Sequence, residues 1–129
     1  MDTQIETGRR LLVVDDEPVQ CLIVTQAMTA FGYMADSATS LEEATARITH
    51  DGYDIVVLDL SVGERAGISV LRLLASSPGD PVVVFMSRQE NAIHSAGIQF
   101  ARELGLRIAG TIANPMRPSA LRALLTEVT

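Results

Sequence analysis

The chain contains no lysine, and all ten of its basic residues are arginines. It has no tryptophan and only five other aromatic residues (two tyrosines and three phenylalanines), so aliphatic side chains must fill the core. The single cysteine, Cys21, excludes an internal disulfide. No apolar run approaches the roughly 18 residues of a membrane helix, and residues 1–8 lack the apolar centre of a signal peptide. These absences predict a cytoplasmic setting, under reducing conditions and away from membranes.

Sixteen acidic and ten basic residues give the chain a net charge of −6. An acidic surface disfavours direct binding to nucleic acid or to an anionic membrane. The length of 129 residues corresponds to one domain, and a hydrophobic fraction of 47% is enough for a buried core. The composition therefore indicates one acidic globular domain.

Short apolar runs alternate with amphipathic stretches along the whole sequence. The expected strands cover residues 11–14, 33–37, 55–58, 82–86 and 109–113. A helix is expected after each strand. Pro18 and Pro118 suit the first turns of the first and last helices, and Ser40 and Glu43 form a capping-box pattern. This alternation predicts an α/β fold in which a doubly wound, five-stranded parallel sheet carries helices on both faces.

Carboxylates follow two of these expected strands directly. Asp15 and Asp16 come after residues 11–14, and Asp59 comes after residues 55–58. In open parallel sheets the ligand crevice lies outside the carboxyl ends of the strands, so the three side chains are expected to converge. Carboxylates at close range repel each other unless a cation lies among them, and the chain has no lysine to supply one.

With these features the chain resembles the response-regulator receiver domain, the phosphorylation module of two-component signalling. The likeness rests on Val14-Asp15-Asp16-Glu17, on Asp59 with Gly67 downstream, on Ser87 after the fourth strand, and on Asn114-Pro115 after the fifth. It covers the chain from about residue 10 to residue 128. It implies a flavodoxin-like fold, with a tail at residues 1–9 and a receiver domain at residues 10–129.

The resemblance also implies a chemistry. Asp59 would accept a phosphoryl group from a sensor histidine kinase or a phosphotransfer protein, and the Ser87 hydroxyl would donate to a phosphoryl oxygen. Mg²⁺, which prefers oxygen ligands, would be held by Asp15, Asp16, Asp59 and the backbone carbonyl of Ser61. Phosphorylation would switch an output domain or a downstream protein, so the domain is expected to signal rather than to act as an enzyme.

The main departure from the family pattern is the missing lysine, because Asn114 stands before the proline that follows the fifth strand. A charge-assisted hydrogen bond of the kind that this lysine makes is worth about 1.5–3 kcal/mol. Arg88 is the candidate to supply the missing charge, and a solvated loop arginine is the alternative. Gly63 and Thr111 replace a proline and an aromatic ring that are common in the family. These changes leave a second function open, a pseudo-receiver that binds partners without control by phosphorylation.

A stand-alone enzyme of similar fold is the third hypothesis. A dehalogenase-type phosphatase would need an aspartate where Ser61 stands. A flavodoxin or a dinucleotide-binding fold would need a hydroxyl-rich or glycine-rich phosphate loop where residues 15–18 stand, and the sequence has neither. Residues 101–106 and 117–121 are similar to those of receivers that precede cyclic-di-GMP phosphodiesterase domains, so such a domain is one expected output partner.

Overall fold

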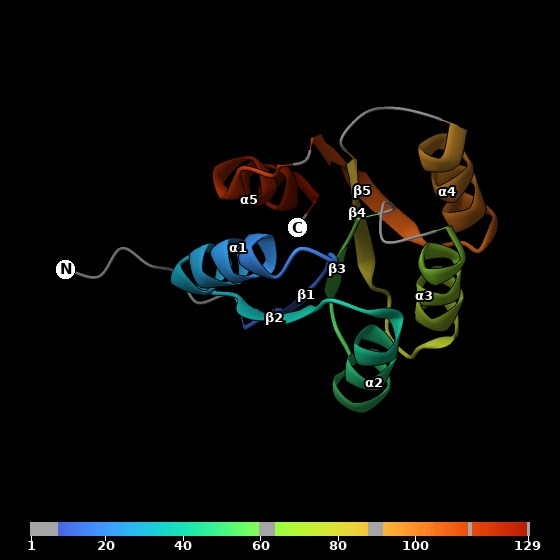
Figure 1. Cartoon of the computed structure of the whole chain (residues 1–129), viewed down its shortest axis with the longest axis horizontal. Coiled ribbons are helices and arrows are strands. Elements are labelled where there is room, and N and C mark those ends of the chain that lie inside the picture. Colours follow the sequence, from blue (N-terminus) through green and yellow to red (C-terminus); the bar gives the residue numbers. More distant parts are fainter. Residues whose placement is uncertain (1–7, 60–63, 88–91, 114, 129) are drawn as a thin grey trace.

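The computed structural model describes residues 8–59, 64–87, 92–113 and 115–128, in which five strands alternate with five helices (Figure 1). The strands are β1 (Arg10–Val14), β2 (Met34–Ala38), β3 (Ile55–Asp59), β4 (Val82–Ser87) and β5 (Arg107–Ala113). The helices are α1 (Pro18–Ala30), α2 (Leu41–Asp51), α3 (Glu64–Ser76), α4 (Ala92–Glu103) and α5 (Pro118–Val128). The predicted alternation is confirmed.

The strands form one parallel sheet in the order β2-β1-β3-β4-β5. This is the flavodoxin-like order, with the switch in winding direction between β1 and β3. Val14 pairs with Leu58, so the residues that follow them lie next to each other at the carboxyl edge of the sheet. The predicted doubly wound sheet is therefore confirmed, and its topology sets the position of the acidic residues.

Helices cover both faces of the sheet, with α1 and α5 on one face and α2, α3 and α4 on the other (Figure 1). Each face has its own hydrophobic cluster, because successive residues of a strand point to opposite sides. Leu12, Val56 and Phe85 belong to the cluster under α2–α4. Leu11 and Val57 belong to the cluster under α1 and α5. Within the described ranges, no helix is both long enough and apolar enough to cross a bilayer.

The second helix begins with the predicted cap. The backbone N–H of Glu43 donates to the Ser40 hydroxyl at 3.1 Å, which satisfies one of the free donors of the first turn. The Glu43 carboxylate accepts from the backbone N–H of Thr39 at 2.7 Å, one residue earlier than in the usual capping box. This reciprocal pair fixes the point where the chain leaves β2 and enters α2.

The last strand is longer than the sequence predicts. Arg107 and Ile108 already pair with β4, so β5 begins two residues before the expected start at residue 109. The register then shifts, and Gly110 lies against α5. A side-chain carbon at this glycine would lie 3.1 Å from a methyl carbon of Leu124, so α5 packs closely here and a larger residue would require the Leu124 side chain to shift.

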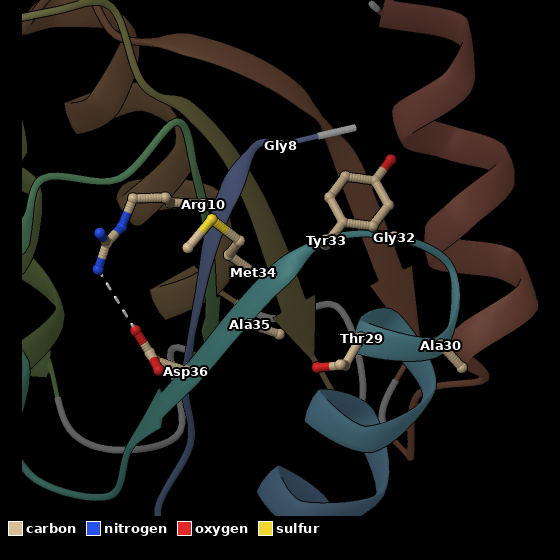
Figure 2. A pocket seen from close by; sticks show the side chains of 9 residues that line it. All are labelled: Gly8, Arg10, Thr29, Ala30, Gly32, Tyr33, Met34, Ala35 and Asp36. Atoms are coloured by element: carbon tan, nitrogen blue, oxygen red, sulfur yellow. Dashed lines mark ion pairs between the residues drawn. The ribbon is translucent and has the colours of Figure 1, made fainter. Parts of the chain in front are cut away.

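A polar network fastens α2 to the edge of the sheet near the amino ends of the strands. Asp36 of β2 accepts a hydrogen bond of 2.8 Å from the Tyr53 hydroxyl. Arg10 and Arg47 approach the same carboxylate at 3.8 and 3.9 Å. Figure 2 shows Arg10 and Asp36 facing each other among the residues that line a pocket between β2 and the end of α1. Asp36 thus joins β1, β2, α2 and the segment before β3.

We predict that Asp36→Ala lowers the free energy of unfolding by about 1–3 kcal/mol, because it removes the hydrogen-bond acceptor of the Tyr53 hydroxyl and the counter-charge of two guanidinium groups. Urea denaturation measures the change. Asp80→Ala is the matched control, since Asp80 pairs with Arg107 at 3.3 Å through side chains that are 68% and 50% exposed. An exposed pair of this kind contributes about 0–1 kcal/mol. Equal losses in the two variants would contradict the structural role of Asp36.

Candidate functional site

Three carboxylates meet at the carboxyl edge of the sheet. Asp15 follows the last residue of β1, Asp59 is the last residue of β3, and Asp16 begins the loop that leads to α1. One oxygen from each side chain lies within 4.8 Å of the other two. Asp15 and Asp59 are buried, with 0% and 1% of their surface exposed, whereas Asp16 is exposed. The structure therefore brings together the three acidic residues whose convergence the strand pattern predicts.

The position of Asp15 is fixed by its neighbours. Its backbone N–H donates to the carbonyl oxygen of Ala38 at 3.1 Å, which ties it to the end of β2. Its Oδ1 accepts from the backbone N–H of Glu17 at 3.1 Å, which holds the turn before α1. Its Oδ2 is buried and has no hydrogen-bond partner among the described residues. One oxygen of this carboxylate thus shapes the loop before α1.

The carboxylate of Asp15 is difficult to ionise. Burial raises its pKa from the usual 3.8 to about 6, and the nearby charges of Asp59 and Asp16 contribute to the rise. The hydrogen bond from the Glu17 backbone acts in the opposite direction and lowers the pKa. In the absence of a cation, ionised Asp15 is therefore a source of instability at neutral pH.

Sequence reasoning missed one contact at this site. The Cys21 thiol, in the first turn of α1, donates to the backbone carbonyl of Asp15 at 3.3 Å. Burial raises the pKa of this thiol to about 11, so it stays protonated at neutral pH. The sequence marks Cys21 as an ordinary helix residue and carries no signal for this contact, because the helix is apolar on both its buried and its exposed side.

The other expected site residues lie along the same edge or outside the described residues. Ser87 is the last residue of β4 and follows Met86, which pairs with Asp59. Ser61, Gly63, Arg88 and Asn114 fall outside the described residues, so the positions predicted for them are not tested. Thr111 is exposed on β5.

The donor set suits a small, hard cation. The three side chains offer carboxylate oxygens, which Mg²⁺ prefers together with water and phosphate oxygens. The observation that fits such a cation best is the buried Asp15 oxygen without a hydrogen-bond partner among the described residues. A cation would satisfy this oxygen and offset the repulsion among the three charges.

A sequence model of the response regulator receiver domain matches residues 11–126, which is most of the chain. The chain belongs to this family. The acidic cluster described above lies within the matched range, at the edge where β1 and β3 end.

Several relatives of this receiver domain are longer proteins. It is 34% identical over 89 residues to the probable transcriptional regulatory protein TcrX of Mycobacterium tuberculosis, covering 68% of this chain and 38% of that protein. It is 29% identical over 128 residues to the transcriptional regulatory protein ResD of Bacillus subtilis, covering 99% of this chain and 49% of ResD. The chain thus spans half or less of the length of these two relatives.

Solved structures share the fold. A response regulator from Colwellia psychrerythraea aligns with a TM-score of 0.74 at 24% identity, covering 95% of this chain and 97% of that one. A CheY-like receiver domain from Methylobacillus flagellatus aligns with a TM-score of 0.73 at 19% identity, covering 95% of this chain and all of that one. At these identities the likeness establishes the five-stranded receiver fold.

We predict that Asp15→Asn stabilises the metal-free receiver domain at pH 7.5 by up to about 3 kcal/mol, since each unit of pKa shift is worth about 1.4 kcal/mol. The pKa of Asp15 is higher in the folded state, so the penalty is present above about pH 6 and fades as the pH falls towards 4. The gain from the substitution should therefore be large at pH 7.5 and small at pH 4.5.

Urea denaturation in the presence of a chelator measures this gain. Glu127→Gln, which removes an exposed carboxylate on α5, is the control and should change the stability little at either pH. A free energy of unfolding that is the same for Asp15→Asn and the wild type at pH 7.5 would refute the electrostatic penalty.

Proposed function

We propose that this receiver domain is a phosphoacceptor, in which Asp59 takes a phosphoryl group from a sensor histidine kinase or a phosphotransfer protein in a Mg²⁺-dependent reaction. The observation that supports this proposal is the cluster of Asp15, Asp16 and Asp59, with a buried Asp15 oxygen that lacks a partner among the described residues. The phosphorylated domain would then switch an output domain or a downstream protein.

Each residue of the cluster has its own part in the proposed reaction. A carboxylate oxygen of Asp59 attacks the phosphorus atom, a P–O bond forms, and the P–N bond to the donor histidine breaks. The product is an acyl phosphate, and the donor imidazole leaves with the electron pair. Asp15, Asp16, Asp59 and the carbonyl of Ser61 would hold Mg²⁺, which screens the charge between the carboxylate and the phosphoryl oxygens. The position of Asp59 at the end of β3 keeps its backbone fixed during the attack.

The phosphoryl oxygens carry negative charge, which needs a hydrogen-bond donor or a cation in place of the missing lysine. Ser87, at the end of β4, is proposed to donate its hydroxyl to a phosphoryl oxygen. Arg88 is proposed to supply a cation, because a guanidinium suits the oxygens of a phosphoryl group, and Asn114 offers a neutral amide instead. The absence of lysine also favours the second candidate function, a pseudo-receiver that works without phosphorylation.

The output is proposed to lie outside this domain. The named relatives are transcriptional regulators that this chain matches over half or less of their length. A DNA-binding output is therefore one proposal, and the cyclic-di-GMP phosphodiesterase expected from sequence similarity remains another. With a net charge of −6, the receiver domain itself is not proposed to contact DNA.

We predict that acetyl phosphate with Mg²⁺ adds one phosphoryl group to the wild type, as read by intact mass. Asp59→Asn should accept none, because the nucleophile is lost, and Asp16→Asn should accept far less, because the cation is held more weakly. Asp80→Asn removes an exposed carboxylate at the opposite edge of the sheet and should react like the wild type. If saturating acetyl phosphate leaves the wild type unmodified, the pseudo-receiver is the better description.

A docking face for the phosphodonor protein is proposed on α1. This helix begins two residues after Asp16 and packs its inner side on the sheet. Its outer side exposes Val19, Leu22 and Ile23 by 66%, 56% and 50%. These residues are spaced as i, i+3 and i+4, so they form one apolar face beside the acidic cluster. A surface helix that is apolar on both sides is typical of a partner-binding element.

We predict that replacing both Leu22 and Ile23 by serine slows phosphotransfer from the cognate kinase by about tenfold, equivalent to about 1.4 kcal/mol of lost binding. The rate with acetyl phosphate should stay within about twofold of the wild type, because the small donor needs no docking face. Met34→Ser, which changes an apolar residue that is 55% exposed on β2, is the control and should leave both rates unchanged. An equal loss with both donors would contradict a docking role.

A further inference from the structure

The carbonyl group that the Cys21 thiol contacts belongs to the peptide joining Asp15 to Asp16. The distance from sulfur to carbonyl oxygen is 3.3 Å, and Cys21 is 2% exposed. The peptide is planar, so the direction of this carbonyl also fixes the direction of the Asp16 N–H and the position of the Asp16 Cα. A contact to this oxygen therefore acts on both neighbouring carboxylates at once.

We infer that Cys21 is a positioning residue for the metal site: its thiol fixes the peptide between Asp15 and Asp16, and thereby the relative placement of their carboxylates. This inference rests on the proposed function, because it requires that the acidic cluster binds a divalent cation. Cys21 itself is not a ligand in this inference, since Mg²⁺ prefers oxygen donors and the thiol is directed to the carbonyl.

The thiol completes a set of three contacts around Asp15. The backbone N–H of Asp15 is held by the carbonyl of Ala38, and its Oδ1 is held by the N–H of Glu17. The contact from Cys21 holds the carbonyl oxygen. These contacts come from the end of β2, from the loop and from α1. Asp16 is exposed, so its placement depends strongly on the peptide that the thiol fixes.

The thiol is buried, with 2% of Cys21 exposed, so its hydrogen bond to the Asp15 carbonyl lies away from bulk water.

Three substitutions separate positioning from simple packing. Cys21→Ser keeps a donor in a slightly smaller side chain. Cys21→Val removes the donor and approximately keeps the volume, and Cys21→Ala removes both. Val24→Ala is the matched control, because Val24 is fully buried on the same side of α1, one turn further from the site. The control should lower the melting temperature of the metal-free protein without changing the affinity for metal.

The experiment measures the Kd for Mn²⁺ by electron paramagnetic resonance of the free ion, with Mg²⁺ as competitor, and the melting temperature of each metal-free variant. Residues that orient metal ligands typically contribute 10–100-fold to affinity, and a thiol is a weak donor. We therefore expect Cys21→Val and Cys21→Ala to raise the Kd by about three- to tenfold. Cys21→Ser should stay within about twofold of the wild type, and Val24→Ala should bind like the wild type.

Two results would overturn the positioning role while leaving the proposed function intact. One is a wild-type Kd in Cys21→Val. The other is a loss of affinity in Cys21→Ser or Val24→Ala as large as that in Cys21→Val, which would indicate a general effect of packing. If the wild type itself binds neither Mn²⁺ nor Mg²⁺, the proposed metal-dependent function fails, and the role of Cys21 fails with it.

Discussion

Two buried carboxylates lie side by side because β1 and β3 are neighbours in the sheet and both lead directly into an aspartate. Asp15 and Asp59 cannot turn towards water, since both are almost completely buried. Keeping them together costs free energy, because burial and the nearby charge of Asp59 make Asp15 harder to ionise. The strands offset this cost with apolar side chains on both of their faces, so the hydrophobic core maintains an arrangement of charges that would otherwise move apart. Contacts from β2, the loop and α1 then set the orientation of Asp15.

The two ends of the sheet use charge in different ways. At the carboxyl edge three carboxylates converge closely enough to hold a cation together. Near the amino ends, the carboxylate of Asp36 is surrounded by Arg10, Arg47 and the Tyr53 hydroxyl. The acidic cluster at the carboxyl edge is thus suited to binding a cation, whereas the carboxylate of Asp36 fastens α2 to the edge strand β2. The ion pairs around Asp36 stabilise the fold, and the converging carboxylates at the carboxyl edge are those that the proposed function needs.

The sheet and the meeting of Asp15 with Asp59 could be predicted because both depend on short patterns along the chain. Each buried strand is an apolar run, and the residue after it must lie at the carboxyl edge. The orientation of α1 could not be predicted in this way. The spacing of Ile23, Ala27 and Phe31 predicts a helix, yet Ile23 is half exposed, because the helix is apolar on both sides and periodicity does not indicate which side packs. The contacts around Asp36 also escape local patterns, since Tyr53 lies 17 residues away in the sequence.

The two hydrophobic clusters share no residue among those described, because the sheet separates them completely. A packing change caused by a substitution beneath α1 and α5 can therefore affect the helices on the other face only if the strands themselves shift. Rigid parallel strands with paired backbones resist such shifts. In evolution, the two sides of the molecule are consequently free to diverge at different rates. Changes on one side can accumulate independently of the other, provided that the strands and the aspartates at their ends stay in register.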